Sequence, residues 1–481
     1  MLEAHRTRTA PALAALGCVL ACATVTRVNR EVDDMVAGHR YADAARLLER
    51  SQDVYGERNR LLWDLERAML LHLAGEYEAS NTAFEDAKAA AEWSYTRSVS
   101  QGFGRLALND RVVDYAGENF ERAMIHVFAA INYMQLGKRD EALVEARQLD
   151  HLLRRFATDH GDRYTYQEDA FGRYLTGMLY EGAGDFDDAY IAYWRALEAY
   201  ERYERSYGVG IPASLRGAGA RAARRLGEAQ HREFRERWDG ADAGEFSPDR
   251  SPLLAPFTGD LVILHYNGHS PRKVEQFMDM SFGKGWAYVN ATTTEGVEAD
   301  DVATAAAVAA SIPASDTIRV ALPRYVESPH AIRRVQVRLD DALLVGPVEL
   351  VQDVGAIAMR DLEDRIWSIR ARAIARAAIK YALAKSVSAA AEQSDDQNVR
   401  TVGLVVGALL RAYTVASERA DTRSWSAIPD EIWMVEARVP SGQRRYDLAF
   451  VDEGGRVVER RSGTVRVAPG ARSFVIVRTV Q

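Results

Sequence analysis

Thiols and strong positive charge are both scarce in this sequence. Its 481 residues include only two cysteines, Cys18 and Cys22, which excludes disulfides and thiolate metal sites from the chain beyond position 22. The formal net charge is −8, because 61 Lys and Arg residues are outnumbered by 69 Asp and Glu residues. A chain of this charge lacks the general attraction of basic proteins for phosphate backbones, so we expect no nucleic-acid partner.

Apolar runs long enough to cross a membrane are also missing. Two runs stand out, Thr9–Ala21 and Val402–Leu410, and both are shorter than the ~20 residues that a helix needs to span a bilayer. The second run is followed at once by Arg411, and we interpret it as part of a buried helix. The first run has the length of a signal-peptide core.

The N-terminal run has the layout of a lipoprotein signal. Arg6 and Arg8 form its positive start, and the tetrapeptide V-L-A-C that ends at Cys22 resembles the bacterial lipobox, whose cysteine is acylated. We predict a signal peptide at residues 1–22 with the lipid on Cys22; Cys18 as the lipidated residue and an ordinary secretory signal are the alternatives. By resemblance to such lipoproteins, Ala23 implies sorting to the outer membrane, facing the periplasm.

Recognisable catalytic signatures are missing as well. The sequence contains no Walker-type phosphate loop, no HExxH metal motif and no G-x-S-x-G nucleophile turn. His265 and His269 have the i, i+4 spacing of a metal site on a helix, but Asn267 and Gly268 between them are typical of a turn, which points the rings apart. We therefore predict no enzyme activity, no cofactor and no metal site.

Helical periodicity is the strongest positive signal, and it extends from about Val28 to Trp238. Three segments share one layout: a small residue, a large one three positions later, a turn glycine, and then small and aromatic residues at helical spacing. The turn glycines are Gly75, Gly137 and Gly184. These segments resemble tetratricopeptide repeats (TPRs), which implies an α-solenoid of helical hairpins over residues 27–238, with a generic helical bundle as the alternative.

A TPR solenoid would offer a groove to a helix or an extended peptide from an envelope protein. The candidate groove residues are aromatic or polar positions on the first helix of a repeat: Asn132, Tyr133, Arg173 and Tyr180. For Tyr133 and Tyr180 we favour a place in the core.

The sequence pattern changes after residues 239–257, a Gly-, Pro- and Asp-containing stretch that we interpret as a linker. Residues 258–481 favour strands, with a helical insertion at about 346–420. We therefore predict an α+β multidomain fold, in which the helical part is followed by a β-sandwich-like domain carrying a long helical hairpin. The predicted strands are Leu261–Tyr266, Trp286–Ala291, Ile318–Tyr325, Arg333–Leu339, Glu431–Val439, Arg445–Val451, Arg456–Arg460, Thr464–Val467 and Ser473–Val480.

The clearest electrostatic feature is a basic stretch between residues 360 and 385, where basic side chains outnumber acidic ones. Four of its arginines are candidates for contact with an anionic glycan, a lipid headgroup or an acidic protein: Arg365, Arg370, Arg372 and Arg376. A solvated helix face with i, i+4 ion pairs is the alternative.

A structural lock is predicted where the inserted helices lead back into the sheet. We expect Arg423 to pair with Asp421 or Asp430 while Trp425 seals the end of the sheet. This interpretation is preferred here over a ligand site.

Three segments together resemble an uncharacterised family of bacterial TPR-containing envelope lipoproteins: Asn132–Asp150, Leu362–Tyr381 and Asp421–Ile432. The resemblance covers nearly the whole mature chain. It implies an envelope location and the two-part layout, and it assigns no catalytic residues. The wider class of TPR lipoproteins implies a role in cell-wall or outer-membrane biogenesis, with a peptidoglycan synthase as a plausible partner.

We therefore predict a lipid-anchored scaffold that faces the periplasm and binds an envelope protein. The alternative from another class is an envelope enzyme or a glycan-binding protein with a cleft between the two domains. That alternative needs convergent carboxylates or a histidine-centred site, and the sequence shows neither at a recognisable spacing.

Overall fold

A computed structural model describes residues 27–100, 113–160, 164–238, 257–283, 286–291, 317–343, 348–393 and 419–481, with a few helical positions between 397 and 406. The predicted signal peptide with Cys18 and Cys22 lies outside the described residues, as do residues 239–256 of the predicted linker and most of the second helix of the predicted insertion. Among the described residues no helix is both long enough and apolar enough to cross a membrane.

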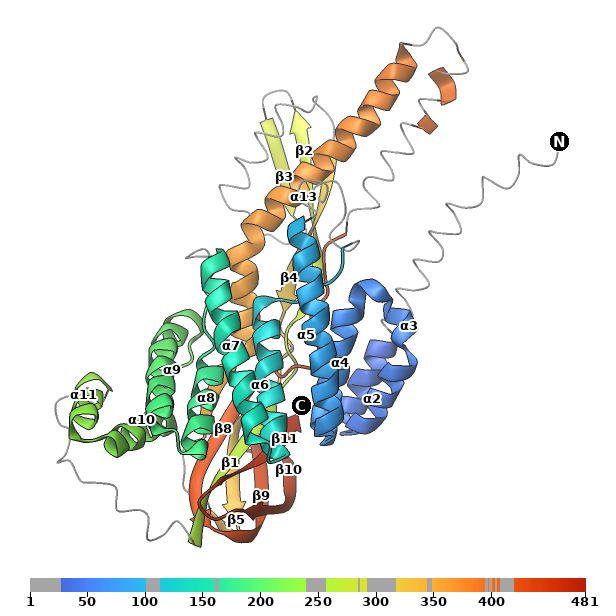
Figure 1. Ribbon diagram of the computed structural model, residues 1–481. Helices are drawn as coiled ribbons and strands as arrows, with labels where there is room; N and C mark the ends of the chain where they lie inside the picture. Colours follow the sequence, from blue (N-terminus) through green and yellow to red (C-terminus); the bar gives the residue numbers. More distant parts are fainter. Residues whose placement is uncertain are drawn as a thin grey trace.

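The N-terminal part is helical, as predicted, and its helices follow one another in a row (Figure 1). Each helix from α4 to α11 packs against the next one in the chain. After a helical segment at residues 27–37, the elements are α2 (Tyr41–Arg50), α3 (Gln52–Tyr55), η1 (Glu57–Asn59), α4 (Arg60–Ala74), α5 (Tyr77–Ser100), α6 (Asn119–Gln135), α7 (Arg139–His160), α8 (Ala170–Ala183), α9 (Phe186–Tyr207), α10 (Ala213–Leu226) and α11 (Glu228–Trp238).

The predicted turn glycines lie between consecutive helices of this row. Gly184 ends α8 in the left-handed region, with φ of 87°, a conformation that costs glycine little and other residues more. Its N–H and that of Asp185 donate to carbonyl oxygens of the last turn of α8. Gly75 and Gly137 also have positive φ. The predicted turns are therefore confirmed, and they fold α4 onto α5, α6 onto α7 and α8 onto α9.

A small residue allows the close approach of α8 to α9. A Cβ atom at Gly177 would overlap the ring of Tyr193, a fully buried side chain on α9. We expect Gly177→Ala to lower the free energy of unfolding by about 1–3 kcal/mol, because the added methyl overpacks this contact. Gly182→Ala on the same helix is the control: nothing lies near its Cβ, so it should raise stability by about 0.5–1 kcal/mol. Urea titrations measure both; equal stability of the two variants would contradict the packing argument.

The C-terminal part is rich in strands, also as predicted, and one long helix interrupts it (Figure 1). This helix, α13 (Val354–Glu392), lies in sequence between β7 and β8. The strands are β1 (Thr258–Asn267), β2 (Arg272–Gly283), β3 (Trp286–Ala291), β4 (Thr317–Val326), β5 (Ile332–Leu339), β6 (Ala342–Leu343), β7 (Glu349–Asp353), β8 (Glu431–Pro440), β9 (Gly442–Asp452), β10 (Val457–Val467) and β11 (Arg472–Thr479).

The described strands form three sheets, with the strand orders β11-β1-β8-β7, β10-β9-β5-β6 and β3-β2-β4. The first and last strands are neighbours, since β1 pairs with β11 in parallel and with β8 in antiparallel fashion. Leu261 and Ile263 of β1 share a core with Leu448 and Phe450 of β9, so the two four-stranded sheets pack on each other.

The other face of β1 packs on the helices. Val262, Leu264 and Tyr266 belong to the large core cluster that also contains Phe84 and Phe128 of the helical part. β1 is therefore buried on both faces, which accounts for its continuous apolar run. The predicted boundary at residues 239–257 separates two kinds of secondary structure that share one hydrophobic core.

Candidate functional site

Asn132, the first of the predicted groove residues, lies inside the protein. It has no exposed surface, its Nδ2 donates to Ser80 Oγ at 2.9 Å and to Asn81 Oδ1 at 2.8 Å, and its Oδ1 is 2.5 Å from Nδ1 of His72. The other ring nitrogen of His72 is 3.1 Å from the hydroxyl of Tyr266 on β1. Asn132 is therefore a link in a buried chain of hydrogen bonds from α5 to the sheet, and no partner can reach it there.

The other predicted groove residues are not gathered on one open surface with it. Arg173 on α8 is buried and is paired with Asp150 and with Glu168. Tyr133 and Tyr180 are half-buried and pack against the large core, as favoured above. The structure thus corrects the expectation of Asn132 and Arg173 as freely available groove residues, because internal partners satisfy their polar groups.

Residues 419–430 lead into β8 after α13, and we call them the return segment. This segment lies against α4 and α6, the first helices of two hairpins. Glu66 of α4 accepts hydrogen bonds from the backbone N–H groups of Ser426 and Ala427, at 2.6 and 2.9 Å. Glu121 of α6 accepts one from the N–H of Trp425 at 2.7 Å. Two buried carboxylates therefore hold three successive amides of a segment that follows α13 by sequence.

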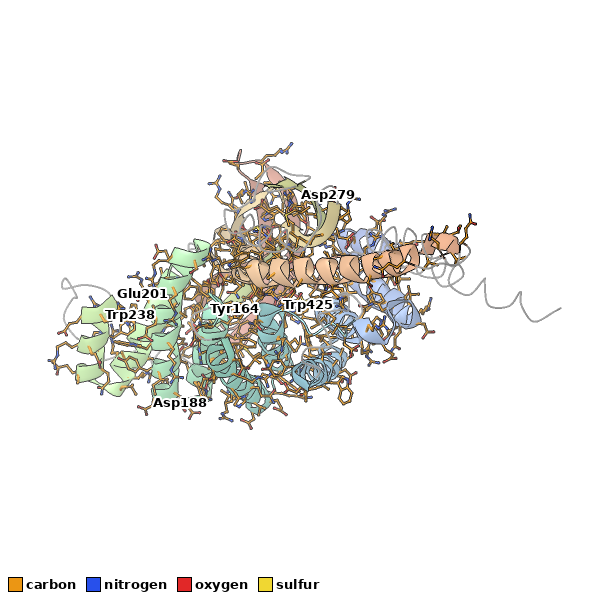
Figure 2. All side chains as sticks on the ribbon, turned by 90° about the horizontal axis from the view of Figure 1, so that it is seen from above. Tyr164, Asp188, Glu201, Trp238, Asp279 and Trp425 are labelled. Carbon is orange, nitrogen blue, oxygen red and sulfur yellow. The ribbon has the colours of Figure 1, made fainter. Side chains whose placement is uncertain are left out.

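The side chain of Trp425 is enclosed by helices. Its ring centroid lies 6.2 Å from that of Phe84 and 5.8 Å from that of Phe128, both in edge-on contact, and only 1% of it is exposed. Arg423 pairs with Asp421 through Nη2 and Oδ2 at 2.8 Å, as predicted. The predicted Arg423–Asp421 pair is confirmed. Trp425, however, which was expected to seal the end of the sheet, packs against Phe84 and Phe128 of the helices instead (Figure 2).

Burial raises the pKa of Glu66 from its ordinary 4.5 to about 7, although its hydrogen bonds from Ser426 and Ala427 work in the opposite direction. The native state then binds the proton more tightly than the unfolded chain. The resulting stability is complete below pH 4.5 and is lost as the pH rises through 7. We expect the free energy of unfolding to fall between pH 5.5 and pH 8.

Denaturant titrations at those two pH values measure this dependence. Glu66→Gln should make the profile less steep, because the amide does not titrate. The remaining slope comes from other buried carboxyls such as Asp361, whose pKa burial raises to about 6. Glu78→Gln, at a position whose side chain is 69% exposed, should leave the profile as it is. A profile that keeps its full slope in Glu66→Gln would contradict the assignment.

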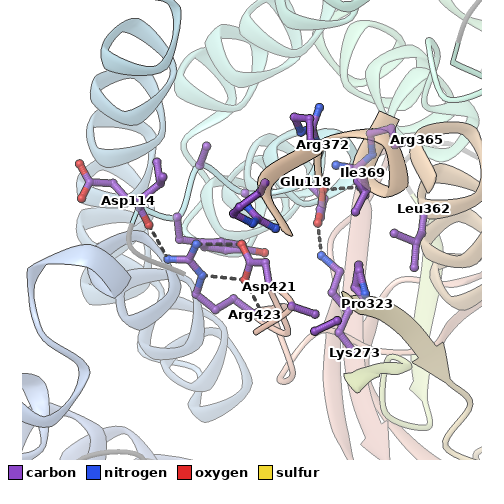
Figure 3. A pocket seen from close by; sticks show the side chains of 17 residues that line it. Asp114, Glu118, Lys273, Pro323, Leu362, Arg365, Ile369, Arg372, Asp421 and Arg423 are labelled. Atoms are coloured by element: carbon purple, nitrogen blue, oxygen red, sulfur yellow. Dashed lines mark hydrogen bonds and ion pairs between the residues drawn. The ribbon is translucent and has the colours of Figure 1, made fainter. Parts of the chain in front are cut away.

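A cavity of about 520 Å³ lies where the helical and sheet parts meet (Figure 3). Five elements form its walls: the loop before α6, strands β2 and β4, one face of α13, and the return segment. Its lining residues are Val113, Asp114, Tyr115, Ala116, Gly117, Glu118, Lys273, Ala321, Pro323, Leu362, Arg365, Ile369, Arg372, Arg376, Ala420, Asp421 and Arg423. Five of them are basic and three are acidic.

The buried wall of the cavity is a network of ion pairs centred on Glu118. This carboxylate pairs with Lys273 of β2 and, at 2.5 Å, with Arg365 of α13, whose guanidinium also binds Asp361 at 2.6 Å. Burial alone would raise the pKa of Glu118, but the charges of Arg365 and Lys273 outweigh it and lower the pKa to about 2. Burial raises the pKa of Asp361 to about 6, against the charge of Arg365. The network fixes α6, β2 and α13 relative to one another.

Arg423 forms a second wall. Its Nε and Nη2 donate to the two oxygens of Asp421, both at 2.8 Å, and its Nη1 donates to the carbonyl oxygen of Val113 at 2.9 Å. The guanidinium carbon stands 5.1 Å from the ring centroid of Tyr115. The guanidinium of Arg423 is therefore neutralised by Asp421 and bonded to the loop before α6.

Three of the four predicted basic-helix residues line the cavity: Arg365, Arg372 and Arg376. Arg370 does not. Arg376 is buried and already bonded within the protein, whereas Arg372 is exposed. Among the described residues no acidic side chain pairs with Arg372.

Comparisons with known proteins do not identify a family or a function for this chain. No family model matches the chain, and no curated protein matches it. Among solved structures it is similar to the crystal structure of BtubC (BKLC) from P. vanneervenii, at 16% sequence identity and a TM-score of 0.31. That match covers 49% of this chain and 89% of that chain. A likeness this weak carries no argument, so the cavity is interpreted from its own geometry.

The seventeen residues that line the cavity include no Ser, Thr, Cys or His. His265 lies elsewhere, on β1, with its Nε2 2.7 Å from Thr479 Oγ1 and its ring against Phe450. Burial lowers the pKa of both His265 and His269 to about 3. In the described part of the chain no cluster of His, Cys, Asp or Glu side chains is arranged to hold a metal ion.

Sequence reasoning missed Glu118 and Lys273. Lys273 lies in β2, a strand that was not predicted, and Glu118 is the N-cap of α6, where it forms a capping box with Glu121. The cavity has the chemistry of a binding site: fixed positive charge, apolar walls and an exposed guanidinium.

Proposed function

We propose that this protein is a lipid-anchored adaptor of the bacterial envelope that binds a partner protein in the cavity between its two parts. In this proposal the helical hairpins form a TPR-like frame, and Cys22 carries the lipid that holds the protein at the outer membrane, facing the periplasm. The exposed, unpaired Arg372 at the cavity is the observation that carries the proposal, because it offers a positive charge that the described chain does not neutralise.

The TPR-like character is supported by local geometry. Antiparallel helices follow in pairs, left-handed glycines end α4 and α8, and a small residue permits the contact of α8 with α9. The frame differs from a free TPR groove in one respect. Segments of the sheet part lie against α4, α6 and α8. We therefore place the partner site at the junction of the two parts and not in the groove predicted from the sequence.

An envelope enzyme or a glycan-binding protein, the alternative function, would need a cleft between the two parts. The cavity lies at that position. Its lining favours binding over turnover, since the carboxylate of Glu118 is paired with Lys273 and Arg365 and no Ser, Thr, Cys or His is among the lining residues. A protein that assembles cell wall or outer membrane is the class of partner in this proposal, by analogy with TPR lipoproteins.

Affinity capture from crosslinked envelopes tests the function. We expect a partner to be recovered with the intact protein and lost with Arg372→Glu, because the reversed charge repels an acidic segment. Arg338→Glu is the matched control: it makes the same change of charge at an exposed position on β5, away from the cavity, and should keep the partner. Equal recovery with both variants would contradict the assignment of the cavity.

A further inference from the structure

The apolar and charged residues of the cavity alternate along one face of α13. Leu362, Arg365, Ile369, Arg372 and Arg376 follow one another at intervals of three and four residues, so all five side chains lie on the same side of the helix. Ile369 and Arg372 are three residues apart, which places their Cβ atoms about 5–6 Å from each other. An apolar contact and a free guanidinium are therefore adjacent.

β4, which packs against α13, adds an apolar part to the cavity wall. Ala321 and Pro323 line the cavity from β4, and Lys273 lines it from the neighbouring strand β2. A volume of about 520 Å³ lies within the range of ~300–1,000 Å³ that is usual for small-ligand sites. It fits the end of a chain or a few residues, and it is too small for a folded surface.

Charge pairing shows how many negative charges the cavity can take. Lys273 and Arg365 share Glu118, and both oxygens of Asp421 hold Arg423. One exposed guanidinium, that of Arg372, has no acidic partner in the described chain. One uncommitted guanidinium matches one monoanion, and its planar fork fits a carboxylate through two parallel hydrogen bonds.

A carboxylate next to an apolar side chain is the chemistry of a polypeptide C-terminus. We propose that the cavity receives the C-terminal residue of a partner protein, with its α-carboxylate on Arg372 and its apolar side chain against Leu362 and Ile369. This inference rests on the proposed function and specifies which part of the partner is bound. An internal Asp or Glu carries its carboxylate on a side chain of its own, so it cannot fill both contacts from one residue.

Synthetic peptides test the inference on the purified full chain. Acetyl-Gly-Ser-Ala-Leu with a free C-terminal carboxylate should bind at least about 10-fold more tightly than the same peptide with a carboxamide, because only the carboxylate can form a charge-assisted pair with Arg372. Arg372→Gln should remove this difference, and Arg338→Gln should retain it. Isothermal titration calorimetry measures all six combinations of the two peptides with the unchanged protein and the two variants.

Two further probes separate the competing ligands. An amidated peptide with an internal glutamate tests an acidic side chain, and inorganic phosphate tests a dianion; both should compete weakly with the free-acid peptide. Equal binding of acid and amide, or tighter binding of the glutamate peptide or of phosphate, would overturn the inference. Suppose that the peptide result contradicts the inference. If Arg372→Glu nevertheless loses the envelope partner, the proposed function stands and only the C-terminus inference fails. If Arg372→Glu retains the partner, the proposed function and the inference both fail.

Discussion

Replacing Trp425 by alanine is expected to lower the free energy of unfolding by about 3–5 kcal/mol, the range for large buried aromatic side chains. The ring is 1% exposed and lies against Phe84 and Phe128 of the helices, while the backbone N–H of Trp425 is held by Glu121. The substitution leaves a cavity in the core that the two parts share, so helices and sheets should both be destabilised.

Thermal and urea unfolding, followed by far-ultraviolet circular dichroism, measure this loss. Trp93→Ala is the matched control, because the side chain of Trp93 is 68% exposed on α5 and its removal should change stability by less than about 0.5 kcal/mol. A Trp425→Ala protein as stable as the control would contradict the shared core.

Neutralising Glu118 should have an effect of similar size. Glu118→Gln leaves the buried Lys273 without its anionic partner. It also leaves Arg365 with Asp361 alone, and we expect the two losses together to cost about 3–5 kcal/mol of stability. The contribution of Glu118, whose pKa is lowered to about 2, is present above its ordinary value of 4.5 and is lost as the pH falls through 2. The destabilisation of Glu118→Gln should therefore be fully developed at pH 7.

A second substitution makes this prediction specific. Adding Lys273→Met to Glu118→Gln removes the buried cation that lost its partner and should restore part of the stability. The control is Glu363→Gln on α13, where the side chain is 65% exposed and its pair with Arg360 contributes little. A double variant less stable than Glu118→Gln alone would show that the cation is not the cause.

Elements with a strong sequence period could be predicted, and elements held by tertiary contacts could not. The helices were predicted from the 3.6-residue period of their apolar residues, and the turns from the glycines between those helices. The structure confirms a left-handed turn conformation at Gly184. β2 was missed because its sequence, RKVEQFMDMSFG, mixes charged and apolar residues without clear alternation. β7 was assigned to the following helix, since Glu349–Asp353 is short and runs directly into α13.

The site was predicted only in part. A surplus of arginines identified the helix that lines the cavity, because uncompensated charge is visible in a sequence. The burial of Asn132 was not visible, because its partners Ser80, Asn81 and His72 come from two other helices. Glu118 and Lys273 are 155 residues apart, and only the fold brings them together.

Site-specific photo-crosslinking in intact envelopes tests most directly whether the partner binds at the junction cavity. A photo-reactive amino acid placed at position 116, which lines the cavity and leaves Arg372 in place, reports on the cavity, and one placed at position 180 reports on the helical groove predicted from the sequence. We predict a crosslinked partner from position 116 and none from position 180. A partner crosslinked from position 180 alone would contradict the account.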